Sequence, residues 1–168
     1  MKIEEFYQKA RVIPSFRQAF LDGIDLGEYE RYISRVKYIS EKSLLGILVK
    51  DSGGMGNFQL NPLGWFMKGI KSLVLVDEKP FSQLENPYDF IGCLLYHEGD
   101  HAKQGFERGQ RLTRREREFF EALAWTNQYR NMDFERCSKD YKALVFREFS
   151  RRAKFLQLTD LDEAQSLA

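Results

Sequence analysis

The chain contains two histidines, His97 and His101, and a glutamate, Glu98, follows the first directly. On an α-helix, four residues turn the chain only about 40° beyond a full turn, so both imidazoles would face the same side. Such a pair can bind one metal ion, and Glu98, about 80° from the midpoint of the pair, could contact a water molecule beside that ion. A chance match has a probability on the order of one in a thousand. The pattern therefore indicates a metal site on a helix.

The residues around the two histidines predict the helix that such a site requires. Asn86 is a favourable N-cap, Pro87 suits the first helical position, and Asp89 lies in the first turn, where its carboxylate can meet free amides. Residues 90–96 are apolar on every side, which is typical of a helix buried within a domain, and the helix is expected to end near Gly105. Buried imidazoles and carboxylates are costly unless something pairs them, and a metal ion would do so.

A third protein ligand is needed, because catalytic zinc usually takes three and the chain has no further histidine. Glu121 is the first candidate, since it lies between apolar residues on the next predicted helix and is expected to point inward. Glu118, about one turn earlier on nearly the same face, is the main alternative. Glu107 is a weaker one, because a chain that turned back after His101 could present it to the same ion.

Hydrophobic periodicity predicts one α+β domain over residues 1–168, with a small twisted sheet packed on helices. Residues 1–42 are predicted as N-terminal helices, and residues 29–39 form the last amphipathic pattern among them. The following segment, residues 43–77, is predicted to carry strands.

Two short apolar runs rich in β-branched residues, 44–49 and 70–76, are the predicted strands of that segment. Antiparallel members are expected in the sheet. The strand at 70–76 is a candidate for a free edge, to which an extended substrate could pair by strand addition.

The C-terminal part, residues 87–156, is predicted to be helical and to carry the metal site. Thr113 and Glu116 have the spacing of a capping box, and the helix that they open is expected to end near residues 130–131. A last helix is predicted over residues 138–155.

The composition argues against several classes of protein. The chain has 168 residues, a net charge of +1 and two cysteines, Cys93 and Cys137. These values favour one ordinary domain in a reducing compartment and give no global attraction to nucleic acid. No apolar run approaches a membrane span, and residues 1–5 lack the apolar core of a signal peptide, so a cytoplasmic location is expected.

The sequence H-E-G-D-H at residues 97–101, with Glu121 on a following helix, resembles the gluzincin group of zincin metallopeptidases. In that group a strand-containing half precedes the motif helix, and a glutamate from a later helix completes the site. The resemblance implies a zincin-like domain with one zinc ion per chain, held by His97, His101 and Glu121. It also implies that Glu98 is the general base.

The resemblance covers residues 88–129, and the chain departs from the family's pattern within them. Asp100 stands where these motifs usually carry an uncharged residue, and it could orient a ligand histidine. Trp125 occupies the position, one turn after the glutamate ligand, at which the thermolysin-type branch has an acidic residue. Glu107 stands where metzincins have a third histidine, so the metzincin signature is not met.

The resemblance implies zinc-dependent hydrolysis of a peptide or protein substrate, in which Glu98 takes a proton from water and passes it to the leaving amine. Tyr129, Tyr141 and Asn127 are candidate donors to the oxyanion, and the sequence does not choose between them. The alternative is a zincin-fold metal-binding regulatory or interaction protein with little or no peptidase activity. A di-iron carboxylate bundle is excluded, because it needs two Glu-x-x-His pairs and the chain has one.

Overall fold

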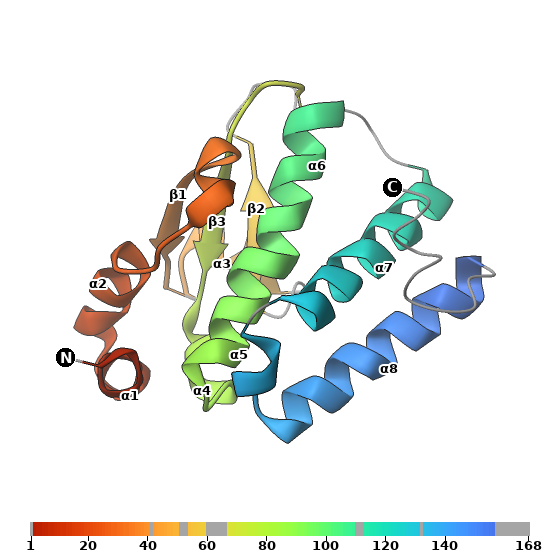
Figure 1. The fold of residues 1–168 in the computed structure, drawn as a ribbon. Coiled ribbons are helices and arrows are strands. Elements are labelled where there is room, and N and C mark those ends of the chain that lie inside the picture. Colours follow the sequence, from red (N-terminus) through yellow and green to blue (C-terminus); the bar gives the residue numbers. More distant parts are fainter. Residues whose placement is uncertain are drawn as a thin grey trace.

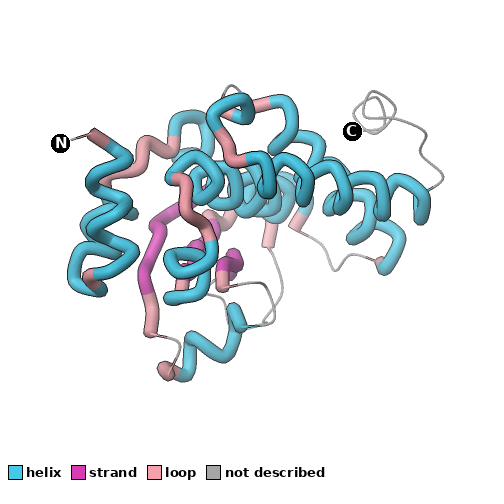
Figure 2. Tube along the Cα trace, turned by 90° about the horizontal axis from the view of Figure 1, so that it is seen from below, coloured by secondary structure: helices cyan, strands magenta, loops and turns pink. Residues whose placement is uncertain are grey.

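The computed structural model describes residues 2–40, 42–50, 54–59, 67–109, 113–131 and 133–156. This part of the chain combines a three-stranded sheet with helices that pack on it and extend beyond it (Figures 1 and 2). The predicted mixture of helices and a small sheet, α+β, is therefore confirmed. Residues 157–168 of the predicted domain lie outside the described residues.

The sheet has the strand order β1-β3-β2, with β3 (Ser72–Val76) at its centre. β1 (Ile33–Tyr38) runs parallel to β3, and β2 (Met55–Phe58) runs antiparallel to it. The prediction of a strand within residues 70–76 is confirmed, as is the expectation of an antiparallel member. The expectation that this strand offers a free edge is wrong, because β1 and β2 flank it on both sides.

β1 falls in the pattern, residues 29–39, that was predicted to be helical. Its pairing with β3 shifts register between Ile33 and Arg35, which is the mark of a β-bulge. The extra residue places the buried side chains of Ile33 and Val36 three positions apart rather than two. A bulged strand therefore shows the i, i+3 spacing of a helix, and the prediction was wrong for that reason.

The predicted strand at residues 44–49 is instead a helix, α3 (Leu44–Lys50). The hydroxyl of Ser43 accepts a hydrogen bond of 3.0 Å from the amide of Gly46, as an N-cap residue does. Val49 is fully buried in a cluster with Ile39 and Leu75. A short apolar run does not distinguish a strand from a packed helix, and here packing on the sheet decides for the helix.

The two histidines lie on one continuous helical segment, residues 87–108, here called the motif helix. It consists of α5 (Pro87–Ile91), the π-helical segment η3 (Gly92–Gly99) and α6 (Asp100–Arg108). The sheet lies on one side of it and α7 (Arg114–Arg130) and α8 (Lys139–Leu156) on the other (Figure 1). The helix ends at Arg108, three residues later than the expected end at Gly105, and Gly109, with a left-handed φ of 57°, caps it.

The start of the motif helix agrees with its predicted capping, with one difference. The side chain of Asn86 accepts a hydrogen bond of 2.9 Å from the amide of Tyr88, and Pro87 occupies the first turn. Asp89 does not cap its own helix. Its buried carboxylate accepts hydrogen bonds from the amide and the hydroxyl of Ser138, at 2.8 and 2.6 Å, just before α8 begins. The motif helix therefore anchors α8.

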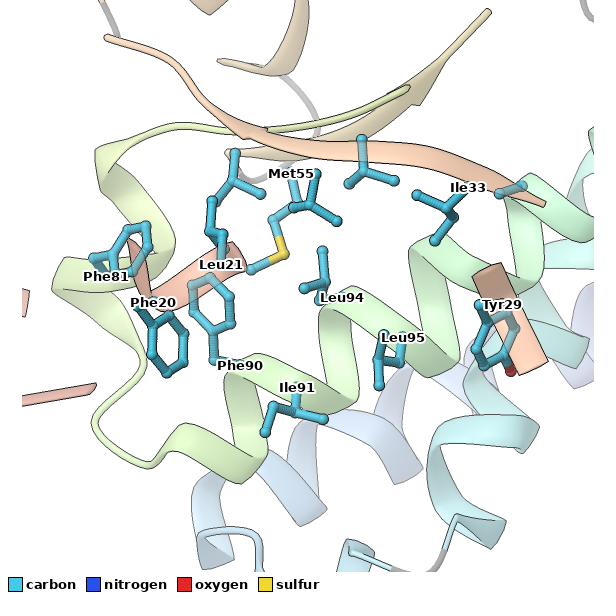
Figure 3. Packing of buried hydrophobic residues seen from close by; sticks show 14 of the residues in the cluster. Phe20, Leu21, Tyr29, Ile33, Met55, Phe81, Phe90, Ile91, Leu94 and Leu95 are labelled. Atoms are coloured by element: carbon cyan, nitrogen blue, oxygen red, sulfur yellow. The ribbon is translucent and has the colours of Figure 1, made fainter. Parts of the chain in front are cut away.

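One face of the motif helix forms the main hydrophobic core with the sheet. Phe90 and Leu94 are fully buried and point toward Ile33 of β1 and Met55 of β2 (Figure 3). Phe81 and Phe20 extend this cluster from neighbouring helices. Since burying a large apolar side chain stabilises a fold by about 1.5–3 kcal/mol, this face fixes the helix and the histidines that it carries.

Two glycines at the ends of η3 let neighbouring rings approach the motif helix closely. A Cβ atom at Gly92 would lie 2.6 Å from the hydroxyl oxygen of Tyr141, and one at Gly99 would lie 2.8 Å from Cδ1 of Tyr29. Neither separation is compatible with a side chain. At these two positions α8 and the short helix before β1 (Gly27–Arg31) therefore contact the π-helical segment directly.

The two C-terminal helices lie side by side and follow their predicted boundaries closely (Figure 1). Thr113 and Glu116 form the predicted capping box at the start of α7. None of the helices in the described ranges is both long enough and apolar enough to cross a membrane. The remaining helical elements are α1 (Ile3–Val12), η1 (Pro14–Phe16), α2 (Arg17–Asp22), η2 (Gly27–Arg31), α4 (Glu78–Gln83) and η4 (Phe134–Arg136).

Candidate metal centre

Three side chains converge between the motif helix and α7. His97 comes from η3, His101 from α6 and Glu121 from α7, and one potential ligand atom of each lies within 4.8 Å of the others. Nε2 of His101 lies 3.1 Å from Oε1 of Glu121, and Nε2 of His97 lies 3.7 Å from Oε2. Over the described ranges, no other cluster of three His, Cys, Asp or Glu side chains could hold a metal ion. The structure thus brings together the three residues that the sequence proposed as ligands.

The surroundings of His101 suit a metal ligand. Its Nδ1 lies 3.0 Å from the amide oxygen of Gln104, which only accepts, so Nδ1 carries a proton. In the neutral imidazole, Nε2 then presents its lone pair to Oε1 of Glu121, which lies 3.1 Å away and cannot donate. A buried nitrogen lone pair that faces a carboxylate oxygen fits a metal ion between them. Two imidazoles and one carboxylate are a ligand set typical of catalytic zinc.

Asp100 supports His101 indirectly. The amide nitrogen of Gln104 donates a hydrogen bond of 2.8 Å to Oδ2 of Asp100, and Asn127 of α7 also hydrogen-bonds this carboxylate. Burial raises the pKa of Asp100, while His101 and these hydrogen bonds oppose the shift. Gln104 therefore links the carboxylate of Asp100 to the imidazole of His101.

The surroundings of His97 are different. The ring of Trp125 lies 4.8 Å from the imidazole, centroid to centroid, and packs against it at an interplanar angle of 60°. A second glutamine, Gln128 of α7, has its amide nitrogen 2.7 Å from Nδ1 of His97. Trp125 thus packs against His97, and the hydrogen-bonding contact to this histidine comes from Gln128, one turn further along α7.

The two alternative glutamates lie outside the cluster. Oε2 of Glu118 lies 3.7 Å from Nε of Arg152, and the carboxylate of Glu107 accepts a hydrogen bond of 3.3 Å from the hydroxyl of Tyr32. Arg152 of α8 also contacts Glu121, with Nη2 lying 3.4 Å from Oε2. The guanidinium therefore holds the carboxylate whose other oxygen faces His101.

Glu98 is buried beside the cluster and faces the sheet. The amide nitrogen of Asn57, on β2, donates a hydrogen bond of 2.9 Å to its Oε2. Burial raises the pKa of Glu98, and the neighbouring His101 and the hydrogen bond from Asn57 partly offset that shift. A carboxylate fixed through one oxygen, with a raised pKa, is suited to accept and return a proton.

The charges of the metal-free cluster follow from burial and from the Glu121 carboxylate. Burial lowers the pKa of His97 to about 3, and the proximity of His101 adds to this shift. Burial would also lower the pKa of His101, but its contact with Glu121 prevails and raises it to about 9. Burial would raise the pKa of Glu121, whereas the same contact lowers it to about 2. At neutral pH the cluster therefore holds an ion pair of His101 and Glu121 beside a neutral His97.

Zinc affinity should depend on pH, because the ion must displace the proton that His101 holds below pH about 9. Raising the pH removes this competition, so the apparent affinity is expected to rise about tenfold per pH unit through neutral pH and to level off near pH 9. Calorimetry in buffers of different ionisation enthalpy should detect about one proton released from the protein per zinc ion bound at neutral pH. An affinity that stays constant over this range would show that His101 is already neutral.

The structure gives all three candidate oxyanion donors other contacts. Tyr141 is buried and donates its hydroxyl hydrogen bond to Gln128, behind His97. The ring of Tyr129 packs against Phe134 and Phe146, and Asn127 hydrogen-bonds Asp100. None of the three therefore stands out as the donor.

Four residues that contact the site were missed from the sequence: Asn57, Gln104, Gln128 and Arg152. Gln104 carried a local signal, because it lies three residues after His101 and four after Asp100 on the same helix. The other three come from β2, α7 and α8, and their contacts depend on how these elements pack. No local sequence pattern predicts such contacts.

No protein-family model matches this chain, and searches of curated proteins and of solved structures find no match either.

Proposed function

We propose that this protein is a zinc-dependent hydrolase of peptide bonds, built on a zincin-like domain. The observation that carries the proposal is the convergence of His97, His101 and Glu121 beside a buried glutamate, Glu98. A zinc ion bound there would polarise a peptide carbonyl and lower the pKa of a water molecule to about 7. Two imidazoles, one carboxylate and an adjacent base are the parts that this chemistry requires.

In this mechanism the chain's own residues hold the ion and move the proton. His97, His101 and Glu121 bind the ion, and Arg152 keeps the Glu121 carboxylate in place through its other oxygen. Glu98, held through Oε2 by Asn57, takes a proton from the attacking water with its other oxygen. It then delivers that proton to the leaving amine. The raised pKa of Glu98 makes its carboxylate a stronger base and so favours the first step.

The substrate is an extended segment of peptide or protein. β2 pairs with β3 on one side and forms an edge of the described sheet on the other. Asn57, on this strand, contacts Glu98, so a peptide that paired with the edge of β2 would lie near the base. We therefore assign the substrate-pairing role to β2 in place of the strand within residues 70–76.

The experiment that tests the proposal is a survey of peptide cleavage with and without a chelator. Protein loaded with one equivalent of zinc is incubated with unfolded proteins and a mixed peptide library, and the products are identified by mass spectrometry. We expect new termini that disappear with 1,10-phenanthroline and return when zinc is added back. Autocleavage of the purified protein is measured in the same way.

Tight zinc binding without chelator-sensitive cleavage would favour the second candidate, a metal-binding regulatory protein with little or no peptidase activity. One observation favours it, since the contacts of Tyr129, Tyr141 and Asn127 identify none of them as an oxyanion donor. Absence of zinc binding would contradict both candidates.

A further inference from the structure

A chain of polar side chains runs from His97 into the interior, away from the metal cluster. Gln128 lies 2.7 Å from Nδ1 of His97, and the hydroxyl of Tyr141 hydrogen-bonds the other end of its amide. Sγ of Cys93 lies 3.5 Å from that hydroxyl. Gln128 is fully buried and Tyr141 is 3% exposed. Because burying an amide is costly, such a chain is stable only if its members satisfy one another.

The fold delivers each member of this chain to His97. Gln128 lies seven residues after Glu121 on α7, which places both on nearly the same face, two turns apart. Tyr141 lies near the start of α8, the end that Asp89 anchors to the motif helix. Its hydroxyl reaches Gln128 over Gly92, where a Cβ atom would lie only 2.6 Å from the hydroxyl oxygen. The absence of a side chain at this position makes room for the contact.

The amide of Gln128 can meet His97 in two ways. With its nitrogen toward Nδ1, it donates, and the neutral imidazole must carry its proton on Nε2, which faces Glu121. With its oxygen toward Nδ1, it accepts, and the lone pair of Nε2 becomes free to face Glu121. A rotation of the amide by half a turn converts one arrangement into the other without moving His97 or Tyr141. In the second arrangement Gln128 donates to Tyr141, and Tyr141 can donate to Cys93.

We propose that Gln128 is the positioning residue of His97 and that metal binding selects the arrangement with its oxygen on Nδ1. This inference rests on the metal site proposed above. That arrangement would give the two histidines matching support. Gln104 accepts from Nδ1 of His101 within the motif helix, and Gln128, whose amide nitrogen faces Nδ1 of His97 in this structure, would accept there after half a turn. The hydroxyl of Tyr141, which donates to the Gln128 oxygen in this structure, would then accept from the Gln128 nitrogen and keep the amide in place. A hydrogen bond that favours the metal-binding tautomer strengthens metal binding.

The test compares zinc dissociation constants, measured by competition with a chromophoric chelator, in variants of position 128. Gln128→Leu, of similar size, removes the acceptor and is expected to weaken zinc binding about 10–100-fold. Gln128→Glu supplies a stronger acceptor and should bind zinc at least as tightly as the parent. A space-filling role predicts the opposite order, in which Leu is tolerated and a buried carboxylate is harmful. That opposite order, or equal affinity in parent and Gln128→Leu, would overturn the proposal.

A matched control is Thr126→Val, which removes a buried hydroxyl from the same helix. The hydroxyl of Thr126 donates a hydrogen bond of 2.8 Å to the carbonyl of Ala122 within α7, so the zinc affinity of Thr126→Val should stay within about twofold of the parent. Tyr141→Phe, which removes the support of the amide, should weaken binding less than Gln128→Leu does. An affinity in Tyr141→Phe equal to that of the parent would remove Tyr141 from the proposal. Circular dichroism establishes that each variant is folded.

Nitrogen-15 NMR of the zinc-loaded parent supplies a readout that needs no variant. His97 is expected to carry its proton on Nδ1 and to bind through Nε2, and ligation through Nδ1 would overturn the proposal even if Gln128→Glu failed to fold. The outcomes also separate this inference from the proposed function. If the parent binds no zinc, the site itself fails. If the parent binds zinc and cleaves peptides but Gln128→Leu binds equally well, only the role of Gln128 fails.

Discussion

Replacing Glu98 by glutamine is expected to slow chelator-sensitive peptide cleavage by about 10²–10⁴-fold while zinc stays bound. The substitution keeps the size of the side chain, and the amide oxygen can still accept the hydrogen bond from Asn57. It removes the group that takes the proton from water, and no residue in the described part of the chain is placed to replace it. The rate is measured on a substrate from the cleavage survey, and the zinc content by atomic absorption.

Glu107→Gln is the matched control, because it makes the same chemical change on the same helical segment. Glu107 is exposed and contacts Tyr32 rather than the cluster, so its rate is expected to stay within about twofold of the parent. If Glu98→Gln cleaved as fast as the parent in a chelator-sensitive reaction, Glu98 would not be the base. A variant that lost both zinc and activity would show instead that Glu98 supports the metal site.

Changing His97 or His101 to alanine is expected to lower the zinc content from about one ion per chain to nearly none. Each imidazole supplies one of only three protein ligands, so two remain after the change. The measurement is the metal content after gel filtration with excess zinc removed. Stoichiometric zinc in both single variants would refute the site.

Substitutions of the two glutamates of α7, Glu121 and Glu118, test which residue is the third ligand. Glu121→Ala should weaken zinc binding by more than the 10–100-fold that is typical when an outer partner is lost, because it removes a coordinate bond. Glu118→Ala removes the same group one turn away, where it contacts Arg152, and should have a much smaller effect. A collapse of affinity in Glu118→Ala with little change in Glu121→Ala would reverse the assignment.

The parts of the site that could be predicted from the sequence are those specified by local rules. Asn86, Pro87 and the apolar run at residues 90–96 define a buried helix, and residues four apart on it must share a face. Glu121 could be chosen over Glu118 because apolar neighbours indicated which side of α7 points inward. Each of these steps uses helical periodicity, which is the strongest signal in a sequence.

The errors arose where distant contacts override local pattern. The bulge in β1 gives a strand the spacing of a helix, and pairing with β3, far along the chain, decides what it becomes. The role of Asp89 depends on α8, which begins some fifty residues later. Asn57, Gln128 and Arg152 reach the site from three separate elements. Their side chains are ordinary for exposed positions, so only the packed structure indicates their roles.

The contact between Gly99 and Tyr29 constrains how this motif can vary among related proteins. Gly99 is one of the two interior positions of the H-E-x-x-H pattern, which the pattern itself leaves open. Here a Cβ atom at that position would lie within 2.8–3.1 Å of three carbon atoms of the Tyr29 ring. A homologue with a larger residue at 99 must therefore carry a smaller one at 29 or a displaced η2. Positions 29 and 99, seventy residues apart, are therefore expected to co-vary among homologues.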